Sequence, residues 1–489
     1  MKKKTILILT GILILTLLLR LFKLQELYFF TMDESLIAFR ALGLFKYQRP
    51  FLIGGGSPLQ VHLPPYFYYL ASILLLPFNF NPISWGVSGA LFGVLTVYIL
   101  FLLTKKIFNK KTALIASVLY ATSFTAVFFD RHFWPLSLNP IYTLTSLLLL
   151  LKLDQKKAWP YFALAGTMVM AITSDPSNLP LILTVLIFII NQRKKINLKK
   201  TYLSGLSALL VFFTPLLLFD LRHNWVNFSG VFKLFEKTSA LSLSLQRLID
   251  ALLLIPRSLV RFWYSPQTNL IELHSYCISY ANARQHNLSI FLVILAFGVL
   301  AWFIKKANQP ILKAISFLLI FYFSGITLFG SLGYSIFDHY LTGLLPIFAI
   351  ITAFTLSKLS KKLSLILLTI LITFNLLQIT KATNPYGLKH KQNLINWSID
   401  KLDGQPYYLE SISKCHKENG LRYLFELTNN PPQQSFMDPN FFWLYQNPPA
   451  EQKPNKILLV TDKPFESEQK IIHQQTFGAI NAYIYRQDH

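Results

Sequence analysis

Two adjacent acidic residues, Asp33 and Glu34, follow shortly after the first apolar run of the chain, which ends at Leu24. A carboxylate at such a position could act as a general base and accept a proton from an attacking hydroxyl group. The stretch from Asp33 to Ser35 is also typical of a helix start, where Glu34 could cap the helix or pair with Arg40. On the pattern alone, both interpretations stay open.

A second polar cluster, Asp130-Arg131-His132, lies between two apolar runs. Arginine and histidine at a membrane surface could hold a phosphate group, arginine through its two-pronged donor geometry. Alternatively, Arg131 could extend toward the membrane surface and pair with Asp130. The spacing does not separate these two interpretations.

A third cluster, Asp338-His339-Tyr340, comes just before another apolar run. The preference of tyrosine for membrane interfaces explains Tyr340 but not the other two residues. His62, before Pro64-Pro65, is a further polar candidate at a membrane interface, either as a ligand or as an ordinary interfacial residue. If these clusters lie at one membrane depth, they could line a single external pocket.

The composition explains why polar groups near apolar runs attract attention. Of the 489 residues, 53% are hydrophobic and only 14% are charged, where a soluble domain carries roughly 25%. The net charge of +24 comes from basic clusters that separate long apolar runs, which differs from the charge-rich face of a nucleic-acid binder. Two cysteines exclude a disulfide scaffold and a thiolate metal cluster. The sequence therefore predicts an all-α polytopic membrane protein.

Eleven runs are apolar enough to be membrane spans. They cover residues 5–24, 84–104, 112–129, 138–151, 159–174, 178–191, 201–219, 288–304, 310–330, 341–357 and 363–380. With eleven spans and a cytoplasmic N-terminus, every lysine-rich cluster between them lies in the cytoplasm, as the positive-inside rule requires. A twelfth apolar stretch, residues 63–80, would break that agreement, so we interpret it as an interfacial helix rather than a short span.

This threading divides the chain into two domains. Residues 1–380 form the transmembrane module, with external loops 25–83, 130–137, 220–287 and 331–340. Residues 381–489 form a small extracytoplasmic α/β domain, because the apolar runs stop and alternating strands appear near residues 456–460 and 482–485. Cys277 and Cys415 would both lie outside, where an oxidising compartment could pair them.

The order of these features resembles the GT-C glycosyltransferases, in particular the branch with protein O-mannosyltransferases and lipid A aminoarabinose transferases. Four stretches of the first 350 residues carry the resemblance. They are Asp33-Glu34, the segment from His62 through Pro64-Pro65 to Leu70, the segment from Leu103 to Leu114 that leads on to Asp130-Arg131-His132, and the segment from Asp338 to Pro346.

The resemblance implies an inverting glycosyltransferase at the extracytoplasmic face of a plasma membrane, with a polyprenyl-phosphate sugar donor. Asp33 would activate the acceptor hydroxyl, with Glu34 beside it. The resemblance also implies a set of phosphate-binding candidates, with two acids as further pocket candidates. The phosphate-binding candidates are Arg131, His132, His339, His62 and Tyr340, and the two acids are Asp130 and Asp338.

Two departures limit what the resemblance implies. The family often has a lysine near the position of His62, and many members have an acid shortly after the residue that matches Arg131. We therefore predict no cofactor and no metal site, leaving a divalent ion as an open alternative. The expected partners are the sugar donor, membrane lipids and a protein, lipid or glycan acceptor, and no nucleic acid.

Two alternatives accompany this prediction. A glycan polymerase or ligase would also use polyprenyl-linked donors, and the 220–287 loop contains arginines and histidines suited to it. A lipid-linked-sugar flippase would need a cation-lined cavity deep in the membrane and no acid such as Asp33; the apolar runs hold few charges of that kind. The sugar, the acceptor and the oligomeric state cannot be deduced from the sequence.

Overall fold

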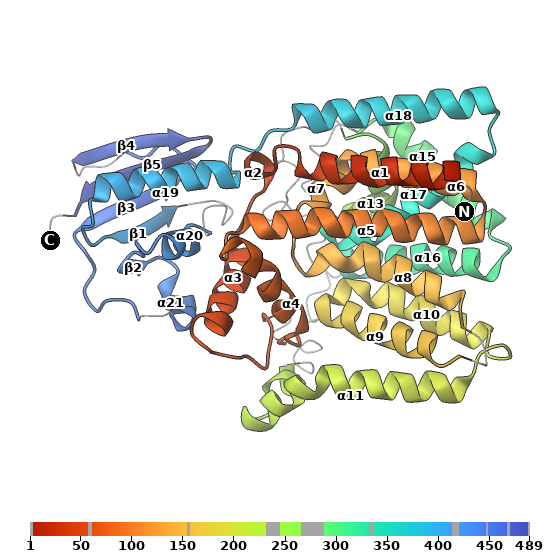
Figure 1. Cartoon of the computed structure of the whole chain (residues 1–489), viewed down its shortest axis with the longest axis horizontal. Coiled ribbons are helices and arrows are strands. Elements are labelled where there is room, and N and C mark those ends of the chain that lie inside the picture. The colour runs from red at the N-terminus through yellow and green to blue at the C-terminus, as the bar shows by residue number, and fades with distance from the viewer. Residues whose placement is uncertain are drawn as a thin grey trace.

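The computed structural model describes residues 3–56, 61–153, 157–230, 245–265, 288–331, 337–412, 420–445, 448–466 and 470–487. A bundle of long helices occupies one side of the molecule and a small sheet domain the other (Figure 1). The helices before the sheet domain are α1 (Lys3–Leu21), α2 (Leu24–Leu27), α3 (Met32–Phe45), α4 (Tyr66–Leu75), α5 (Ile83–Ile107), α6 (Lys110–Thr122), α7 (Phe124–Asp130), α8 (Asn139–Leu150), α9 (Trp159–Ser174), α10 (Leu179–Asn191), α11 (Leu198–Arg222), α13 (Leu245–Trp263), α15 (Ile290–Lys306), α16 (Pro310–Ser331), α17 (Leu345–Ser357) and α18 (Lys361–Lys381).

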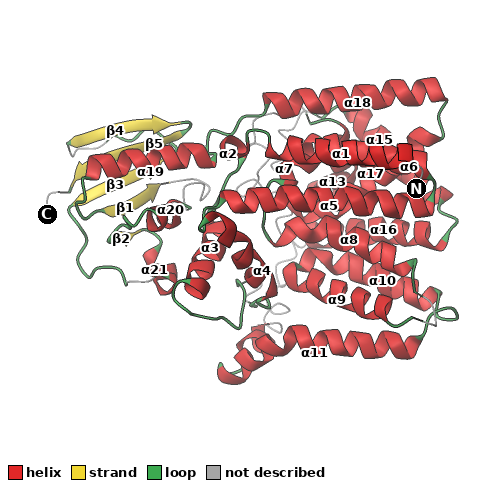
Figure 2. Ribbon diagram, in the orientation of Figure 1, coloured by secondary structure: helices red, strands yellow, loops and turns green. Residues whose placement is uncertain are grey.

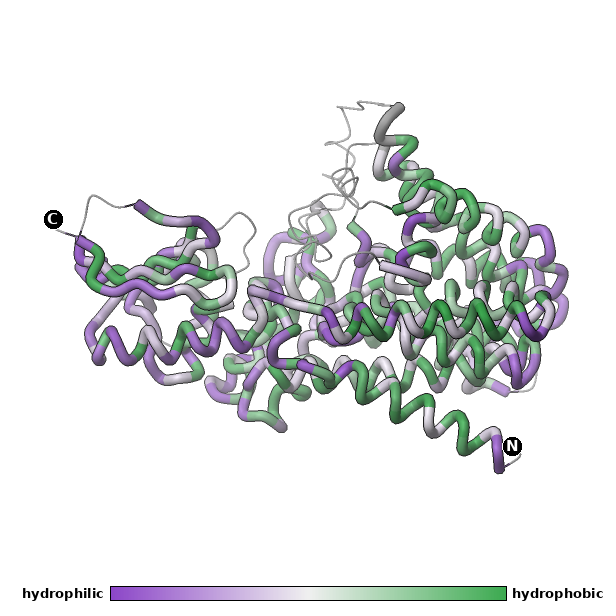
Figure 3. The backbone as a smooth tube through the Cα atoms, turned by 90° about the horizontal axis from the view of Figure 1, so that it is seen from above, coloured by the Kyte–Doolittle hydropathy of each residue, from purple (hydrophilic) through white to green (hydrophobic). Residues whose placement is uncertain are grey.

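Each of the eleven apolar runs coincides with a helix or with a broken pair of helices. Among the described residues, six helices are long and apolar enough to cross a membrane, and a seventh results if α6 and α7, bent by 66° at their junction, count as one span. The mostly helical class is confirmed, whereas the predicted number of eleven spans is not confirmed by length and composition. Hydrophobic colours cover most of the bundle, and the end that holds the N-terminus is hydrophilic (Figure 3).

One helix was not anticipated. The sequence assigned residues 220–287 to an external loop, but α13 lies within that range and packs against α7, α15, α16 and α17. Its sequence is strongly amphipathic, with Arg257 and Arg261 among leucines, so it lacks the uniform apolar character by which spans are recognised. The remaining described part of the loop continues α11 into a short helical corner around Asn227.

Two short helices connect the first span to the second. The helices α3 and α4 pack against each other at the end of the bundle that faces the sheet domain (Figure 1). The stretch interpreted as an interfacial helix forms α4 followed by a 3₁₀ turn, Leu76–Phe78. Trp85 at the start of α5 is fully buried, and its indole nitrogen donates to the carbonyl oxygen of Ala71 in α4 at 2.8 Å. These contacts fix α3 and α4 on the bundle.

The C-terminal domain contains a five-stranded sheet, where the sequence predicted a small α/β domain (Figure 2). The strand order is β2-β1-β3-β5-β4, with β1 parallel to β2 and β3, and β5 antiparallel to β3 and β4. Its elements are α19 (Leu388–Leu402), β1 (Tyr408–Ile412), α20 (Leu421–Leu427), β2 (Gln434–Ser435), α21 (Asp438–Phe441), β3 (Lys456–Thr461), β4 (Ile471–Phe477) and β5 (Ile480–Arg486). Cys277 and Cys415, whose pairing was considered, lie outside the described residues.

Candidate active site

The two adjacent acids face different surroundings because they occupy different positions of a capping box at the start of α3. Thr31 is the extended N-cap residue, and the Glu34 carboxylate accepts hydrogen bonds from its backbone nitrogen at 2.8 Å and from its hydroxyl. Glu34 is therefore buried against the helix start. Asp33 occupies the position between them and is exposed. Only Asp33 is available to an external ligand.

Although Asp33 is exposed, the surrounding protein removes much of its hydration. This loss of hydration, together with the negative charge of Glu34, raises the pKa of the Asp33 carboxyl to about 6. Tyr68 of α4 and Tyr340 lie close enough to interact electrostatically with the Asp33 carboxylate. The first and third polar clusters of the sequence thus meet at one place.

A third carboxylate belongs to the same neighbourhood. Asp175 interacts electrostatically with Tyr340 and with Tyr322 of α16. It is the N-cap of a 3₁₀ turn, and its side chain accepts a hydrogen bond from the backbone nitrogen of Ser177 at 2.7 Å. Tyr340 is therefore near two acidic groups, Asp33 and Asp175.

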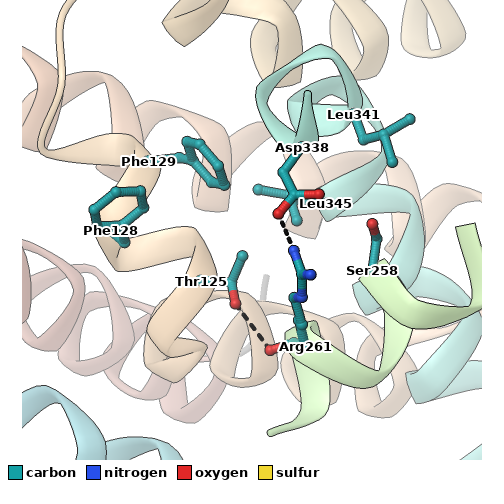
Figure 4. Close-up of a pocket in the computed structure, with 8 residues that line it drawn as sticks. All are labelled: Thr125, Phe128, Phe129, Ser258, Arg261, Asp338, Leu341 and Leu345. Atoms are coloured by element: carbon teal, nitrogen blue, oxygen red, sulfur yellow. Dashed lines mark hydrogen bonds and ion pairs between the residues drawn. The ribbon is translucent and has the colours of Figure 1, made fainter. Parts of the chain in front are cut away.

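Asp338 lies beside a pocket formed by α7, α13 and the 3₁₀ helix η6 (Asp338–Leu344). The pocket is small and mostly apolar, with Phe128, Phe129, Leu341 and Leu345 in its wall. Asp338 forms an ion pair there with Arg261 of α13 (Figure 4). The backbone oxygen of Arg261 accepts a hydrogen bond from the Thr125 hydroxyl at 2.8 Å, which fixes α13 against α7.

The histidine candidates lie among aromatic rings or loops. His339 stacks on Phe337 with a 5.1 Å separation of ring centroids, and its ring lies 4.8 Å from that of Trp134. His62 is half-buried, and its backbone nitrogen donates to the side-chain oxygen of Asn227 at 2.7 Å, beyond α11. His339 is adjacent to Tyr340 near the pocket, whereas His62 contacts the α11 corner.

Asp130 belongs to a buried network rather than to the pocket. Its carboxylate accepts hydrogen bonds from Arg20 of α1 at 2.9 and 2.7 Å and from the Tyr120 hydroxyl at 3.1 Å. A Cβ atom added at Gly93 of α5 would lie 2.5 Å from Arg20 Nε and 2.7 Å from the Asp130 carboxylate. The absence of a side chain at this position gives the ion pair its space.

Arg131 and His132, two of the expected phosphate ligands, are not among the residues that line this pocket. The Arg131 guanidinium donates to the carbonyl oxygens of Leu19, Arg20 and Phe22 at 2.9 to 3.1 Å, and so it caps the end of α1. Burial and the nearby positive charge of Arg20 lower its pKa to about 9. His132 packs against Tyr28, Phe29 and Phe128, and burial lowers its pKa.

Several residues of this arrangement were missed or not ranked by the sequence analysis. Arg20 stands near the end of an apolar run, and a charge at such a place could have been recognised by its cost in a membrane. Asp175 was not singled out in the sequence, and Arg261 was only one of several arginines in the 220–287 loop. Their partners come from elements more than 70 residues away, which local spacing does not reveal.

No group of three or more metal-binding side chains occurs among the described residues. Asp33, Asp175 and Asp338 belong to different segments, and Asp338 is engaged with Arg261. A single acid such as Asp33 does not by itself provide the three or more ligands that a tightly held divalent ion requires.

The chain is similar to known proteins in part of its sequence and in its fold. Residues 62–219 match the family described as dolichyl-phosphate-mannose-protein mannosyltransferase. No curated protein matches the sequence significantly. Among solved structures, ArnT from Cupriavidus metallidurans bound to undecaprenyl phosphate is similar over 99% of this chain and 98% of its own, with a TM-score of 0.61 and 11% identity.

A second relative has a longer chain. The Archaeoglobus fulgidus oligosaccharyltransferase in its apo form matches 86% of this chain and 64% of its own, with a TM-score of 0.52 and 14% identity. The same enzyme tethered with an acceptor peptide containing the NVT sequon matches 89% and 64%, with a TM-score of 0.53 and 13% identity. The apolar helices and the fold together indicate a multi-pass membrane protein. The chain is similar in fold to ArnT and to the archaeal oligosaccharyltransferase, and about a third of it matches the mannosyltransferase family.

Proposed function

We propose that this protein is an inverting glycosyltransferase that moves a sugar from a polyprenyl phosphate to an acceptor hydroxyl at the extracytoplasmic face of the plasma membrane. The observation that carries the proposal is that the two adjacent acids have different surroundings. Glu34 is fixed in the capping box, whereas Asp33 is exposed beside Tyr68 and Tyr340 and has a pKa of about 6. At neutral pH, Asp33 is therefore ionised and able to accept a proton.

In the proposed reaction, the Asp33 carboxylate takes the proton of the acceptor hydroxyl. The freed oxygen forms a bond to the anomeric carbon from the face opposite the phosphate. The bond between that carbon and the phosphate oxygen breaks, and its electron pair leaves with polyprenyl phosphate. Attack from the opposite face inverts the configuration of the sugar.

The departing phosphate needs positive charge or hydrogen-bond donors. Arg261 is the best-placed cation for this role, since it lies in the wall of the pocket formed by α7, α13 and η6 and is balanced by Asp338. His339 and Tyr340 follow Asp338 in the chain and are further candidates for binding the phosphate. The bound undecaprenyl phosphate of the similar ArnT structure supports a carrier of this chemical class.

The test uses purified protein in lipid vesicles, polyprenyl-phosphate sugars with a radiolabel on the sugar, and a set of peptide, lipid and glycan acceptors. We expect Asp33→Asn to lower the rate of label transfer by about 100-fold or more, because a general base contributes that much or more. Glu34→Gln is the matched control at the next residue. It should retain transfer, since glutamine also completes a capping box.

Two results would contradict the proposal. Full transfer by a correctly folded Asp33→Asn variant would exclude Asp33 as the base. Saturable binding of the labelled donor without any release of label would favour a carrier of lipid-linked sugars instead.

A further inference from the structure

The segment that leads into α3 is held by the C-terminal domain. Three carbonyl oxygens of this segment accept hydrogen bonds from residues at the start of that domain. Leu27 O accepts from the Asn384 side chain at 3.0 Å, and Tyr28 O accepts from the backbone nitrogen of Leu388 at 2.7 Å. Phe30 O accepts from the Lys391 ammonium group at 2.7 Å. The bundle and the domain are thus joined immediately before the acidic pair.

Phe30 has a backbone conformation that a bulky residue adopts rarely. Its φ angle is 51°, in the left-handed region, where such a residue persists only if its surroundings hold it. The next residue, Thr31, returns to an extended conformation and starts the capping box of α3. The chain direction at Phe30 therefore determines where α3 begins and where Asp33 lies.

The C-terminal domain contacts Phe30 from two elements. Lys391 of α19 is fully buried, and its ammonium group points at the Phe30 oxygen. From the start of α20, Gly420 approaches so closely that an added Cβ atom would lie 2.8 Å from both the ring and the oxygen of Phe30. A buried ammonium group requires strong acceptors, because its desolvation is costly. Lys391 and Gly420 therefore hold the backbone of Phe30 in its left-handed conformation.

We propose that Lys391 is a positioning residue for sugar transfer: by holding the oxygen of Phe30, it sets the start of α3 and thereby the place of Asp33. This inference rests on the proposed function and assigns to the C-terminal domain a part in building the active site. Lys391 does not contact the reacting groups, and it acts through the backbone of residues 30–33.

The chain offers a matched control on the same helix. Lys389 pairs with Glu26 at 3.1 Å, also across the contact between domain and bundle, but both side chains are largely exposed. Exposed ion pairs of this kind have little effect. We expect Lys391→Met to lower kcat about 100-fold, since a small displacement of a catalytic group has that effect, with KM for the sugar donor unchanged. Lys389→Met should leave both constants unchanged, and Lys391→Arg should restore part of kcat.

A second readout separates this inference from the proposed function. Hydrogen exchange at the backbone amides of residues 31–35 reports the order of the α3 start without any substrate. Lys391→Met should speed this exchange, and Lys389→Met should not. If the wild-type protein transfers no sugar while exchange responds as expected, the proposed function fails and the positioning contact stands.

If Lys391→Met does not fold, Gly420→Ala tests the same contact from α20 and should also lower kcat at constant KM. Normal kcat and normal exchange in a folded Lys391→Met or Gly420→Ala variant would overturn the inference. Equal losses of kcat in Lys389→Met and Lys391→Met would also overturn it, because they would indicate general loosening of the domain.

Discussion

At the scale of single residues, the proposed active site depends on two neighbouring carboxylates with different surroundings. One carboxylate oxygen of Glu34 accepts hydrogen bonds from the backbone nitrogen and the hydroxyl of Thr31, whereas the Asp33 side chain is exposed. Sequence alone marks the pair but does not assign the roles, because both functions suit an acid at a helix start. The assignment required the direction in which each side chain leaves α3.

This arrangement predicts a pH dependence. Burial first, and the charge of Glu34 second, raise the Asp33 pKa to about 6, so transfer should rise with pH to a midpoint near 6 and then level off. Glu34→Gln removes the second cause and should move the midpoint to lower pH. The measurement is kcat between pH 4.5 and pH 8, values that lie on either side of about 6. An unchanged midpoint in Glu34→Gln would exclude the charge of Glu34 as a cause.

The same pKa has a consequence for stability. The Asp33 carboxyl binds its proton more tightly in the folded protein than in the unfolded chain, where the pKa of an aspartate is about 3.9. Ionisation of Asp33 therefore lowers the stability of the folded state as pH rises between about 4 and 6. Asp33→Asn should therefore not lower the melting temperature at pH 7. A loss of transfer in this variant can then be attributed to chemistry rather than to unfolding.

At the scale of elements, α1 and α7 are joined by a buried ion pair. Arg20 is fully buried and bonds to Asp130, while Arg131 covers the last carbonyl groups of α1. The second polar cluster of the sequence is thus an internal joint between helices. The sequence did not reveal this joint because the partner of Asp130 stands 110 residues earlier in the chain.

We expect Arg20→Met to destabilise the protein by about 3–5 kcal/mol, because it leaves the buried Asp130 carboxylate without a counter-charge. The double variant Arg20→Met with Asp130→Leu should be more stable than the sum of the two single changes predicts. Denaturant unfolding in detergent measures these differences. Arg222→Met, at the exposed end of α11, is the control and should change little. Simple additivity in the double variant would contradict the coupling.

At the scale of the whole molecule, the distribution of charge predicts an orientation. The basic clusters between the apolar runs lie near the bundle end that holds the N-terminus, opposite the sheet domain (Figure 1). The positive-inside rule therefore places that end in the cytoplasm and the C-terminal domain outside.

Labelling of single cysteines in intact cells with a membrane-impermeant maleimide measures this orientation, after replacement of Cys277 and Cys415 by serine. A cysteine at position 451 in the sheet domain should react, and one at position 110 should react only after lysis. Both positions are exposed, so burial does not limit labelling. The reverse result would require the opposite orientation.

How much of the molecule follows from sequence depends on the range of the contacts involved. Apolar runs predicted where helices form, because burial in lipid depends on composition over about 20 residues. Alternation predicted β3 and β5, since side chains of a strand face opposite sides. The amphipathic α13, the Arg261–Asp338 pair and the Lys391 contact depend on partners brought together by the fold. Local pattern carries no information about such partners.

The contact between Lys391 and Phe30 also bears on how the protein is made. Residues 27–30 leave the ribosome early, but their hydrogen-bond partners, residues 384–391, are synthesised some 360 residues later. If these partners are needed to order the start of α3, an incomplete chain in the membrane carries Asp33 without a working geometry. Catalytic competence then arrives only after the domain has been translocated and has docked, so unfinished translation products stay inert toward lipid-linked sugars.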